Sequence, residues 1–380
     1  MSDAPRRLLF LTPDLPFFLS HRLPLARAAR AAGYRVAVAA PPGPRTPELV
    51  AEGIEPLALR VTRGSLNPLS EMRTLWRMAR VLREWRPDAV HLITSKSIVY
   101  GGALARVMRI PALAAMTGMG YVFTHDTPKV RLLRAGVVRL YRFALNHRRA
   151  HVLFQNGTDL AVARRYRLIA RARHSIIPGS GTDLSRITPA PLPDGPPVAM
   201  LPARMLRDKG VAEFVEAART LRAEGMAARF VLLGDPDPQN PTSLTAGDLT
   251  AWSEEGVVEW RPFTADVGAA LAECHLVVLP SYREGFPKTL IDAAAAGRAA
   301  IASDVPGCRD AIVPDETGRL FEARSAGSLC DCLREMLGDR DRLERMGAAA
   351  RRHAEAHFDI RDVCRAHLAL YDDLTGLPDR

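Results

Sequence analysis

The stretch LVVLPSYREGFPKTLIDAAAAG, residues 276–297, joins two kinds of local structure through a charged loop. The run LVVLP is too short and too uniformly apolar for a strand with one face in water, and it fits a parallel strand that is buried on both faces. The alanine-rich run favours a helix, and Pro287 fits the first turn of that helix. A strand that leads through a loop into a helix is the repeating unit of a parallel α/β fold.

Short apolar runs of the same kind recur along the whole chain, with helical patterns between them. The predicted strands are 8–11, 36–40, 89–93, 112–116, 151–154, 175–178, 198–201, 229–234, 257–260, 276–280, 299–302 and 318–321. This alternation predicts two doubly wound parallel-sheet (Rossmann-like) domains that face each other across a cleft. Ligands bind such sheets where strands end and helices begin.

The chain of 380 residues is longer than a single core usually supports, so we expect two domains. The Pro-rich segment ITPAPLPDGPP, 187–197, is the predicted linker. The first domain is therefore expected at 1–186 and the second at 198–358, with a C-terminal helix at 359–380 that packs back on the first domain.

The segment NPLSEMRTLWRMARVLREW, 67–85, has the pattern of an amphipathic helix. Asn67 is suited to cap this helix, and Pro68 suits its first turn. An apolar stripe at helical spacing is expected to face the core. Its members are Met72, Leu75, Trp76, Ala79 and Leu82.

Nothing in the sequence has the length of a membrane-spanning helix, and the apolar part of the N-terminus is too short for a secretory signal. The five cysteines are odd in number and form no CxxC pair, which is typical of reduced thiols. We therefore expect a cytoplasmic protein.

The net charge of +10 hides an asymmetry between the two halves of the chain. Residues 1–190 contain 30 Lys and Arg against 11 Asp and Glu, whereas the remainder contains 22 against 31. A basic half of this kind indicates an anionic partner, such as nucleic acid, phospholipid or a phosphorylated ligand. The alternative is a coding bias toward arginine and alanine. Aromatic residues make up only 6% of the chain and no recognised nucleic-acid module is present, so we expect no nucleic-acid partner.

Two cations follow the first strand of the second domain. The segment LPARMLRDKG, 201–210, places Arg204 and Lys209 on a loop that enters a helix near Gly210. A guanidinium and an ammonium close to the N–H groups of a helix start are suited to hold a diphosphate. The alternative is a pair of solvated surface charges.

Two carboxylates bracket the start of the alanine-rich helix. Glu284 precedes the helix and Asp292 lies in its second turn, so they are placed to bind the hydroxyls of a sugar and of a ribose. A sugar nucleotide contains these hydroxyls and a diphosphate. The alternative is a Glu that interacts with the helix dipole and an incidental exposed Asp.

Together these segments resemble the retaining glycosyltransferases of family 4, which have the two-domain GT-B fold. ARMLRDKG resembles the Arg-x4-Lys-Gly motif of the family, and REGFPKTLIDAAAAG resembles its Glu-x7-Glu motif, with Asp292 in the second acidic position. PGSGTDLSRI, 178–187, resembles the segment Pro-Asn-Gly-Val-Asp that ends the first domain, and LLGDPDP, 232–238, a strand end with Gly-Asp. The resemblance spans essentially the whole chain.

The resemblance implies an enzyme that uses Arg204, Lys209 and Glu284 in catalysis, the first two on the departing diphosphate and the third on the donor sugar. Asp292 would hold the ribose, although it is shorter than Glu by one bond of about 1.5 Å. The implied donor-binding residues are Gly234, Gly285, Phe286, Pro287, Lys288, Thr289 and Asp292. Trp260 and Phe263 are expected to flank the base.

Neither a metal nor another cofactor is expected, because these loops supply cations and no Asp-x-Asp precedes the cleft strands. Asp235 and Asp237 form one such pair at a strand end, where a turn is the favoured interpretation over a metal site. The expected mechanism is a front-face substitution with retention, in which the departing phosphate accepts the proton of the acceptor.

The first domain is expected to bind the acceptor, and here the sequence departs from familiar members of the family. A VHG segment is replaced by one with Thr117, and the loop 12–22 has no Gly-Gly pair. Acceptor-side roles would therefore pass to other groups. The candidates are His21, Arg22, Thr117, Tyr121 and His125.

The departures resemble the subgroup that adds an N-acetylated hexosamine to a sugar linked to polyprenyl diphosphate. This resemblance implies a UDP-sugar donor, by analogy only and with GDP left open, and a lipid-linked saccharide acceptor at the inner face of the cell membrane. Residues 127–158 contain seven basic residues and no acid. A basic amphipathic helix there would lie on an anionic bilayer, or it would be an ordinary core helix with a basic outer face.

One other enzyme shares the predicted fold. A sugar-nucleotide 2-epimerase is the alternative function, but the combination of Arg-x4-Lys with Glu-x7-Asp favours sugar transfer.

Overall fold

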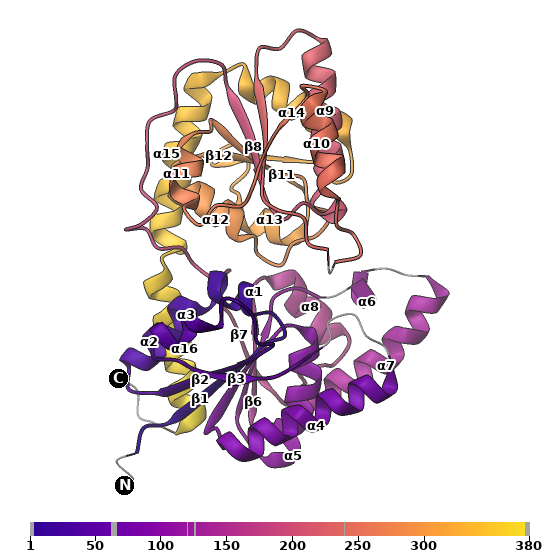
Figure 1. Ribbon diagram of the computed structural model, residues 1–380, viewed down its shortest axis with the longest axis vertical. Helices are drawn as coiled ribbons and strands as arrows, with labels where there is room; N and C mark the ends of the chain where they lie inside the picture. Colours follow the sequence, from indigo (N-terminus) through magenta and orange to yellow (C-terminus); the bar gives the residue numbers. More distant parts are fainter. Residues whose placement is uncertain (1–3, 62–66, 120, 125–126, 239, 377–380) are drawn as a thin grey trace. The chain divides into compact units, whose positions relative to one another are not determined.

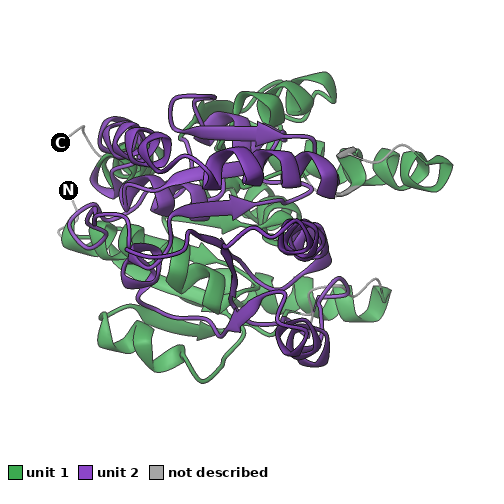
Figure 2. Ribbon diagram, turned by 90° about the horizontal axis from the view of Figure 1, so that it is seen from above, with its two compact units in different colours: residues 1–177, 362–380 green, residues 178–361 purple. Residues whose placement is uncertain are grey.

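The computed structural model describes residues 4–61, 67–119, 121–124, 127–238 and 240–376. The chain divides into two compact units (Figure 2). Unit 1 comprises residues 1–177 and 362–380, and unit 2 comprises residues 178–361. Each unit contains one parallel sheet with helices on both faces, as the sequence predicted (Figure 1).

The sheet of unit 1 has seven parallel strands in the order β3-β2-β1-β4-β5-β6-β7. The strands are β1 Arg7–Leu11, β2 Arg35–Ala40, β3 Glu55–Ala58, β4 Ala89–Ile93, β5 Ala112–Met116, β6 Ala150–Phe154 and β7 Arg173–Ile176. The helices are α1 Leu15–His21, α2 Leu23–Ala31, α3 Thr46–Ala51, α4 Pro68–Trp85, the π-helix η1 Ser97–Gly101, α5 Gly102–Met108, α6 Tyr121–Thr124, α7 Pro128–Leu145, α8 Gly157–Arg165 and the C-terminal α16 Ile360–Thr375.

The sheet of unit 2 has six parallel strands in the order β10-β9-β8-β11-β12-β13. The strands are β8 Val198–Pro202, β9 Arg229–Leu233, β10 Glu259–Arg261, β11 Leu276–Leu279, β12 Ala299–Ser303 and β13 Gly318–Phe321. The helices are the 3-10 helix η2 Arg207–Lys209, α9 Val211–Ala223, α10 Ala246–Glu254, α11 Val267–Ala272, α12 Lys288–Ala295, α13 Pro306–Ala311, α14 Ala326–Leu337 and α15 Arg340–His357.

Every strand that the sequence predicted is present, with each end within two residues of its predicted position. One strand was missed. The missed strand, β3, pairs only with β2 at the edge of the sheet and contains Pro56. An edge strand is buried less completely than a central one, so it carries no continuous apolar run.

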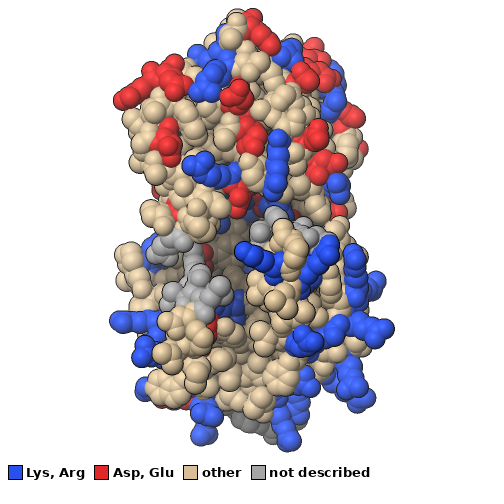
Figure 3. Space-filling model, turned by 90° about the vertical axis from the view of Figure 1, so that its right-hand side faces the viewer, with Lys and Arg blue, Asp and Glu red and all other residues tan. Residues whose placement is uncertain are grey.

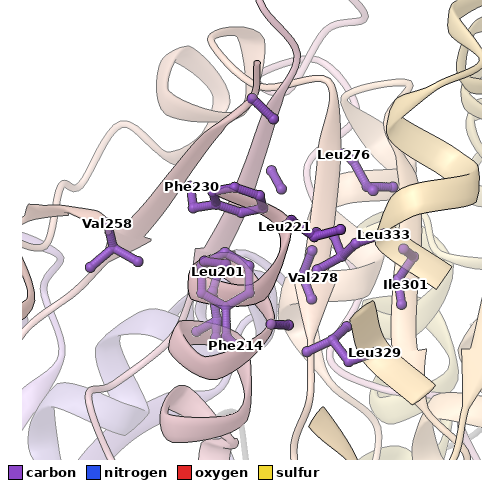
Figure 4. Close-up of a cluster of buried hydrophobic side chains, with 14 of the residues drawn as sticks. Leu201, Phe214, Leu221, Phe230, Val258, Leu276, Val278, Ile301, Leu329 and Leu333 are labelled. Carbon is purple, nitrogen blue, oxygen red and sulfur yellow. The ribbon is translucent and has the colours of Figure 1, made fainter. Parts of the chain in front are cut away.

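The core of unit 2 lies on both faces of its sheet, because successive strand residues point to opposite sides. Leu201 of β8 packs with α9 and α14 on one face (Figure 4). Met200 belongs to the cluster on the other face, which includes α12 and α15. All residues of α12 from Leu290 to Ala295 are buried. The alanines of this helix are therefore core residues, and they hold its charged start in a fixed place.

The buried face of helix α4 differs from the predicted one. Met72 and Trp76 are exposed, whereas Thr74, Met78 and Leu82 face the core. The helix has more large apolar side chains than one face can bury, so the spacing alone did not identify the buried face.

The C-terminal helix α16 returns to unit 1. The hydroxyl of Tyr371 and Nδ1 of His91 on β4 are 2.6 Å apart, and the hydroxyl of Tyr34 donates to Asp372 over 2.6 Å. The first crossing of the chain occurs at residue 178, before the expected linker at 187–197. The reason is that residues 179–182 pack on α12, so they belong to unit 2.

None of the helices in the described part of the chain combines the length and the hydropathy needed to cross a bilayer.

Candidate active site

The strand order reverses once in each sheet, between β8 and β11 in unit 2 and between β1 and β4 in unit 1. The loops that leave two such strands run in opposite directions, and the crevice between them is the usual ligand site of an open α/β sheet. In unit 2 these are the loop 203–210 and the loop 280–287. The predicted residues Arg204, Lys209 and Glu284 therefore all lie at the switch point of one sheet.

Lys209 and Glu284 form an ion pair that joins these two loops. Their side chains are only 23% and 11% exposed. The main chain supports the pair, because the N–H of Tyr282 donates to the carbonyl oxygen of Asp208 over 2.9 Å. Neither charge would stay this buried without the other. The pair thus places a cation and a carboxylate side by side at this edge of the sheet.

Gly210 allows the two loops to approach. It ends η2 with φ +71°, in the left-handed region that favours glycine. A Cβ at this position would lie 2.1 Å from the carbonyl oxygen of Pro280. A side chain at position 210 would push the loop 203–210, called the cation loop below, away from the loop 280–287, called the carboxylate loop.

Arg204 is exposed and donates to the carboxylate of Asp237 over 2.7 Å. The loop of Asp237 is held against the cation loop at Gly234, where a Cβ would lie 2.0 Å from the carbonyl oxygen of Ala203. Asp235 accepts from the N–H of Phe263 over 3.1 Å. In this structure Asp235 and Asp237 thus serve as a loop contact and an ion-pair partner.

Trp260 and Phe263, the two residues predicted to flank the base, lie beside the loop that holds Gly234 and Asp235. The indole N–H of Trp260 donates to the carbonyl oxygen of Gly234 over 2.9 Å, and the side chain of Phe263 is exposed. Phe263 is the only large hydrophobic side chain of unit 2 that is exposed among the described residues. An exposed aromatic ring next to the cation loop is a suitable surface for stacking a base.

The start of α12 differs by one residue from the prediction. Pro287 is the N-cap and has extended backbone angles, and the helix begins at Lys288. Proline has no side-chain acceptor, so it does not cap the first-turn N–H groups, which attract anions. The hydroxyl of Thr289 donates to the carbonyl oxygen of Pro202 over 3.0 Å and ties this helix start to the end of β8. Gly285 and the buried Phe286 complete the turn.

Asp292 is buried, which excludes the alternative of an incidental exposed carboxylate. Its Oδ1 accepts from the hydroxyl of Thr182 over 2.7 Å and from the ammonium of Lys288 over 2.6 Å. Both partners belong to unit 2. The carboxylate is thus held at a defined place, one turn from the start of α12.

The predicted acceptor-side residues that the structure describes lie on two segments of unit 1, one that follows β1 and one that follows β5. His21 ends α1 and stacks on Phe17, with ring centroids 4.2 Å apart. Arg22 is only 2% exposed and lies close to Tyr371 of α16, and burial lowers the pKa of Arg22. Its burial does not fit the predicted contact with an acceptor.

The other acceptor-side predictions follow β5. Thr117 is half-buried at the end of this strand, and Tyr121 begins α6. His125 lies outside the described residues.

A polar cluster that the sequence analysis missed lies at the switch point of unit 1. Lys96 follows β4 and donates to Glu71 over 2.9 Å, and both side chains are largely buried. Burial and Glu71 raise the pKa of Tyr100 to about 12. Thr94 has φ +74°, a strained angle for a β-branched residue. The sequence signal was available, because TSKS directly follows the predicted strand 89–93.

Comparison with known proteins identifies the family. The family model described as glycosyl transferases group 1 matches residues 187–353, and the model described as glycosyl transferase 4-like matches residues 7–156. One relative is the N,N'-diacetylbacillosaminyl-diphospho-undecaprenol alpha-1,3-N-acetylgalactosaminyltransferase of Campylobacter jejuni. It is 28% identical over 378 residues, which cover 93% of this chain and 97% of the relative.

Solved structures identify the fold. Sucrose-phosphate synthase from Thermosynechococcus elongatus matches with a TM-score of 0.79 and 18% identity, over 98% of this chain and 99% of that chain. The Anabaena protein HepE in complex with UDP-glucose matches with a TM-score of 0.76 and 16% identity, over 97% of this chain and 99% of that chain. The fold is GT-B, as the sequence resemblance implied.

The close approach at Gly210 generates a test of the loop geometry. Gly210→Ala should lower the free energy of unfolding of unit 2 by about 3 kcal/mol or more, because the methyl group meets the Pro280 carbonyl. The matched control is Gly225→Ala. Gly225 also has a positive φ, but a Cβ there would have no heavy atom within 4 Å, so this change should cost about 1–2 kcal/mol. Equal losses in urea denaturation would contradict the steric account.

Proposed function

The chain belongs to the group 1 glycosyltransferases, and we propose that it moves an N-acetylhexosamine or hexose from a UDP-sugar to a saccharide linked to polyprenyl diphosphate. The observation that carries the proposal is the meeting of Arg204, Lys209 and Glu284 at the β8/β11 switch point, beside the start of α12. This part of the chain offers cations and helix N–H groups for a diphosphate, and carboxylates for hydroxyls.

The cations act on the diphosphate. Lys209 is paired with Glu284, and Arg204 is paired with Asp237. A diphosphate competes for both cations, and the first-turn N–H groups of Lys288 and Thr289 add further donors. Negative charge on the diphosphate grows as the glycosidic bond breaks, so these contacts strengthen in the transition state.

Glu284 acts on the donor sugar. When the ammonium of Lys209 turns to phosphate, the carboxylate of Glu284 becomes available to accept from sugar hydroxyls. We propose a front-face substitution with retention and without a metal ion, in which the departing phosphate oxygen takes the proton of the acceptor hydroxyl. The cations of the loop 203–210 supply the charge compensation that a metal would otherwise provide.

Comparison with relatives supports the proposed donor. A GT-B protein of similar structure has been solved with UDP-glucose, and a relative over nearly the whole chain is named as an N-acetylgalactosaminyltransferase. Asp292 is proposed to bind the ribose, and Phe263 and Trp260 to flank the base. The name of the same relative, which includes diphospho-undecaprenol, supports a polyprenyl-diphosphate-linked acceptor.

Lys209→Ala tests the donor site. We expect it to weaken UDP binding about tenfold or more in calorimetric titration, because a charge-assisted hydrogen bond to phosphate is lost. Arg207→Ala is the matched control, since it removes the same charge from an exposed neighbour in the same short helix. It should change the affinity less than twofold. The double variant Lys209→Ala with Glu284→Gln separates lost attraction from repulsion by the unpaired carboxylate. If Lys209→Ala bound UDP with the same affinity as wild type, the assignment of the diphosphate site to Lys209 would be contradicted.

The charge and the exposed apolar side chains of unit 1 support a contact with anionic lipid. Unit 1 carries 31 Lys and Arg against 14 Asp and Glu, whereas unit 2 carries 21 against 28. Many basic side chains project from the part of unit 1 that is seen in the lower half of Figure 3, and few acids are seen there. Ten of the eleven large hydrophobic side chains exposed among the described residues also belong to unit 1.

The helix α7 combines both features. Val130, Val138, Tyr141, Ala144 and Leu145 are buried, so one face of this helix packs on the core. The outer face nevertheless exposes Leu132, at 79%, together with Leu140 and Phe143. Exposed arginines lie between these residues. A helix face with arginines and large apolar side chains fits the interface of an anionic bilayer, and we propose that α7 lies on the inner face of the cell membrane.

Liposome sedimentation tests this contact. We expect binding to vesicles that contain phosphatidylglycerol, and binding should weaken with salt because the charges are screened. A triple variant with Leu132, Leu140 and Phe143 changed to Ser should bind at least tenfold more weakly, since each apolar side chain contributes about 1.5–3 kcal/mol when fully buried and a tenfold change needs only about 1.4 kcal/mol in all. Phe263→Ser in unit 2 is the control with an exposed aromatic residue. Equal pelleting with neutral vesicles, or an unaffected triple variant, would remove the proposal.

A further inference from the structure

We propose that Thr182 is a positioning residue of the donor site: its hydroxyl fixes the carboxylate of Asp292 so that one oxygen stays available for a ribose hydroxyl. The inference rests on the proposed function, in which Asp292 binds the ribose. Thr182 lies in the segment 178–183, just after the chain enters unit 2, and no site role was assigned to it from the sequence.

The main chain holds Thr182 on both sides. Its N–H donates to the carbonyl oxygen of Phe358 over 2.8 Å, and its carbonyl oxygen accepts from the N–H of Ile360 over 3.0 Å. The residue is buried, so its side chain has little freedom. The hydroxyl is therefore a donor at a fixed place.

The same segment is packed tightly on the start of α12. Gly179 has φ +64°, and a Cβ there would lie 2.5 Å from Cδ1 of Ile291 and 2.9 Å from Cδ1 of Phe286. Ile291 precedes Asp292, and Phe286 lies in the carboxylate loop. A shift of the segment 178–183 would therefore displace Ile291 and Phe286, and with them the proposed donor site.

The two donors to Asp292 take the same oxygen. Oδ1 accepts from Thr182 over 2.7 Å and from Lys288 over 2.6 Å, and no donor to Oδ2 is found among the described residues. A carboxylate has acceptor sites on both oxygens. Oδ2 is thus left for a hydroxyl of the ligand.

Lys288 alone would hold the carboxylate less firmly than the pair does. Its ammonium ends a flexible four-carbon stem, and it lies next to the N–H groups proposed to bind phosphate, where a diphosphate would attract it. Thr182 has a short side chain and a main chain fixed by two hydrogen bonds. When the site is filled, Thr182 is the partner that keeps Asp292 in place.

The test compares two nucleotides on hydroxyl variants of the whole chain. UDP carries the ribose diol and 2′,3′-dideoxy-UDP lacks it. Thr182→Val removes the donor at nearly constant volume, and we expect UDP to bind about five- to tenfold more weakly, as for one lost hydrogen bond to a charged group. The affinity for 2′,3′-dideoxy-UDP should change less than twofold. Thr182→Ser restores the donor and should bind UDP within twofold of wild type.

The outcomes separate positioning from a structural role. Equal weakening of both nucleotides by Thr182→Val, or no weakening of UDP, would overturn the inference. Should Thr182→Val fail to fold, Thr182→Ala and Thr182→Ser give the same comparison with and without the donor. Equal binding of both nucleotides to wild type would remove the ribose role of Asp292 but leave the diphosphate site at Lys209 standing. Absence of UDP binding to wild type would contradict the proposed function itself.

Discussion

The ion pair between Lys209 and Glu284 is the constraint on which the proposed donor site depends. It places opposite charges on two loops that leave neighbouring parallel strands, and the main chain brings these loops together where only glycine fits, at Gly210. A largely buried charge needs a partner, so Lys209 stays paired with Glu284 until a stronger anion competes for it. Binding of a diphosphate would then change the partner of Lys209 and release Glu284 in the same step. The two residues are coupled because each one is the other's counter-ion.

The sequence predicted the parts of the fold that depend on local pattern. Strands buried on both faces carry continuous apolar runs, so all of them were found, while the half-exposed edge strand β3 was not. Arg204, Lys209 and Glu284 could be grouped from the sequence because carboxyl ends of adjacent parallel strands meet at one edge. Long-range contacts were beyond such patterns. The burial of Arg22 depends on α16, and the partner of Asp292 is Thr182, so neither follows from spacing within one motif.

The two units differ in charge and in exposed apolar side chains, as expected if they bind different substrates. Unit 2 has a mildly acidic surface, a core on both faces of its sheet, and charged groups held by buried helices such as α12. Unit 1 carries the basic charge and nearly all of the exposed large apolar side chains among the described residues. This contrast fits a protein in which one unit holds a sugar nucleotide and the other meets a lipid-linked substrate. The polar cluster of Lys96, Glu71 and Tyr100 lies at the switch point of unit 1 and is the natural place to look for acceptor contacts.

A crystal structure of the protein with UDP bound is the most direct measurement of the central claim. The account predicts that the diphosphate contacts the ammonium of Lys209 and the N–H groups at the start of α12, and that the carboxylate of Glu284 no longer has Lys209 as its sole partner. A nucleotide bound to unit 2 away from the loops that follow β8 and β11, with the Lys209–Glu284 pair unchanged, would contradict it.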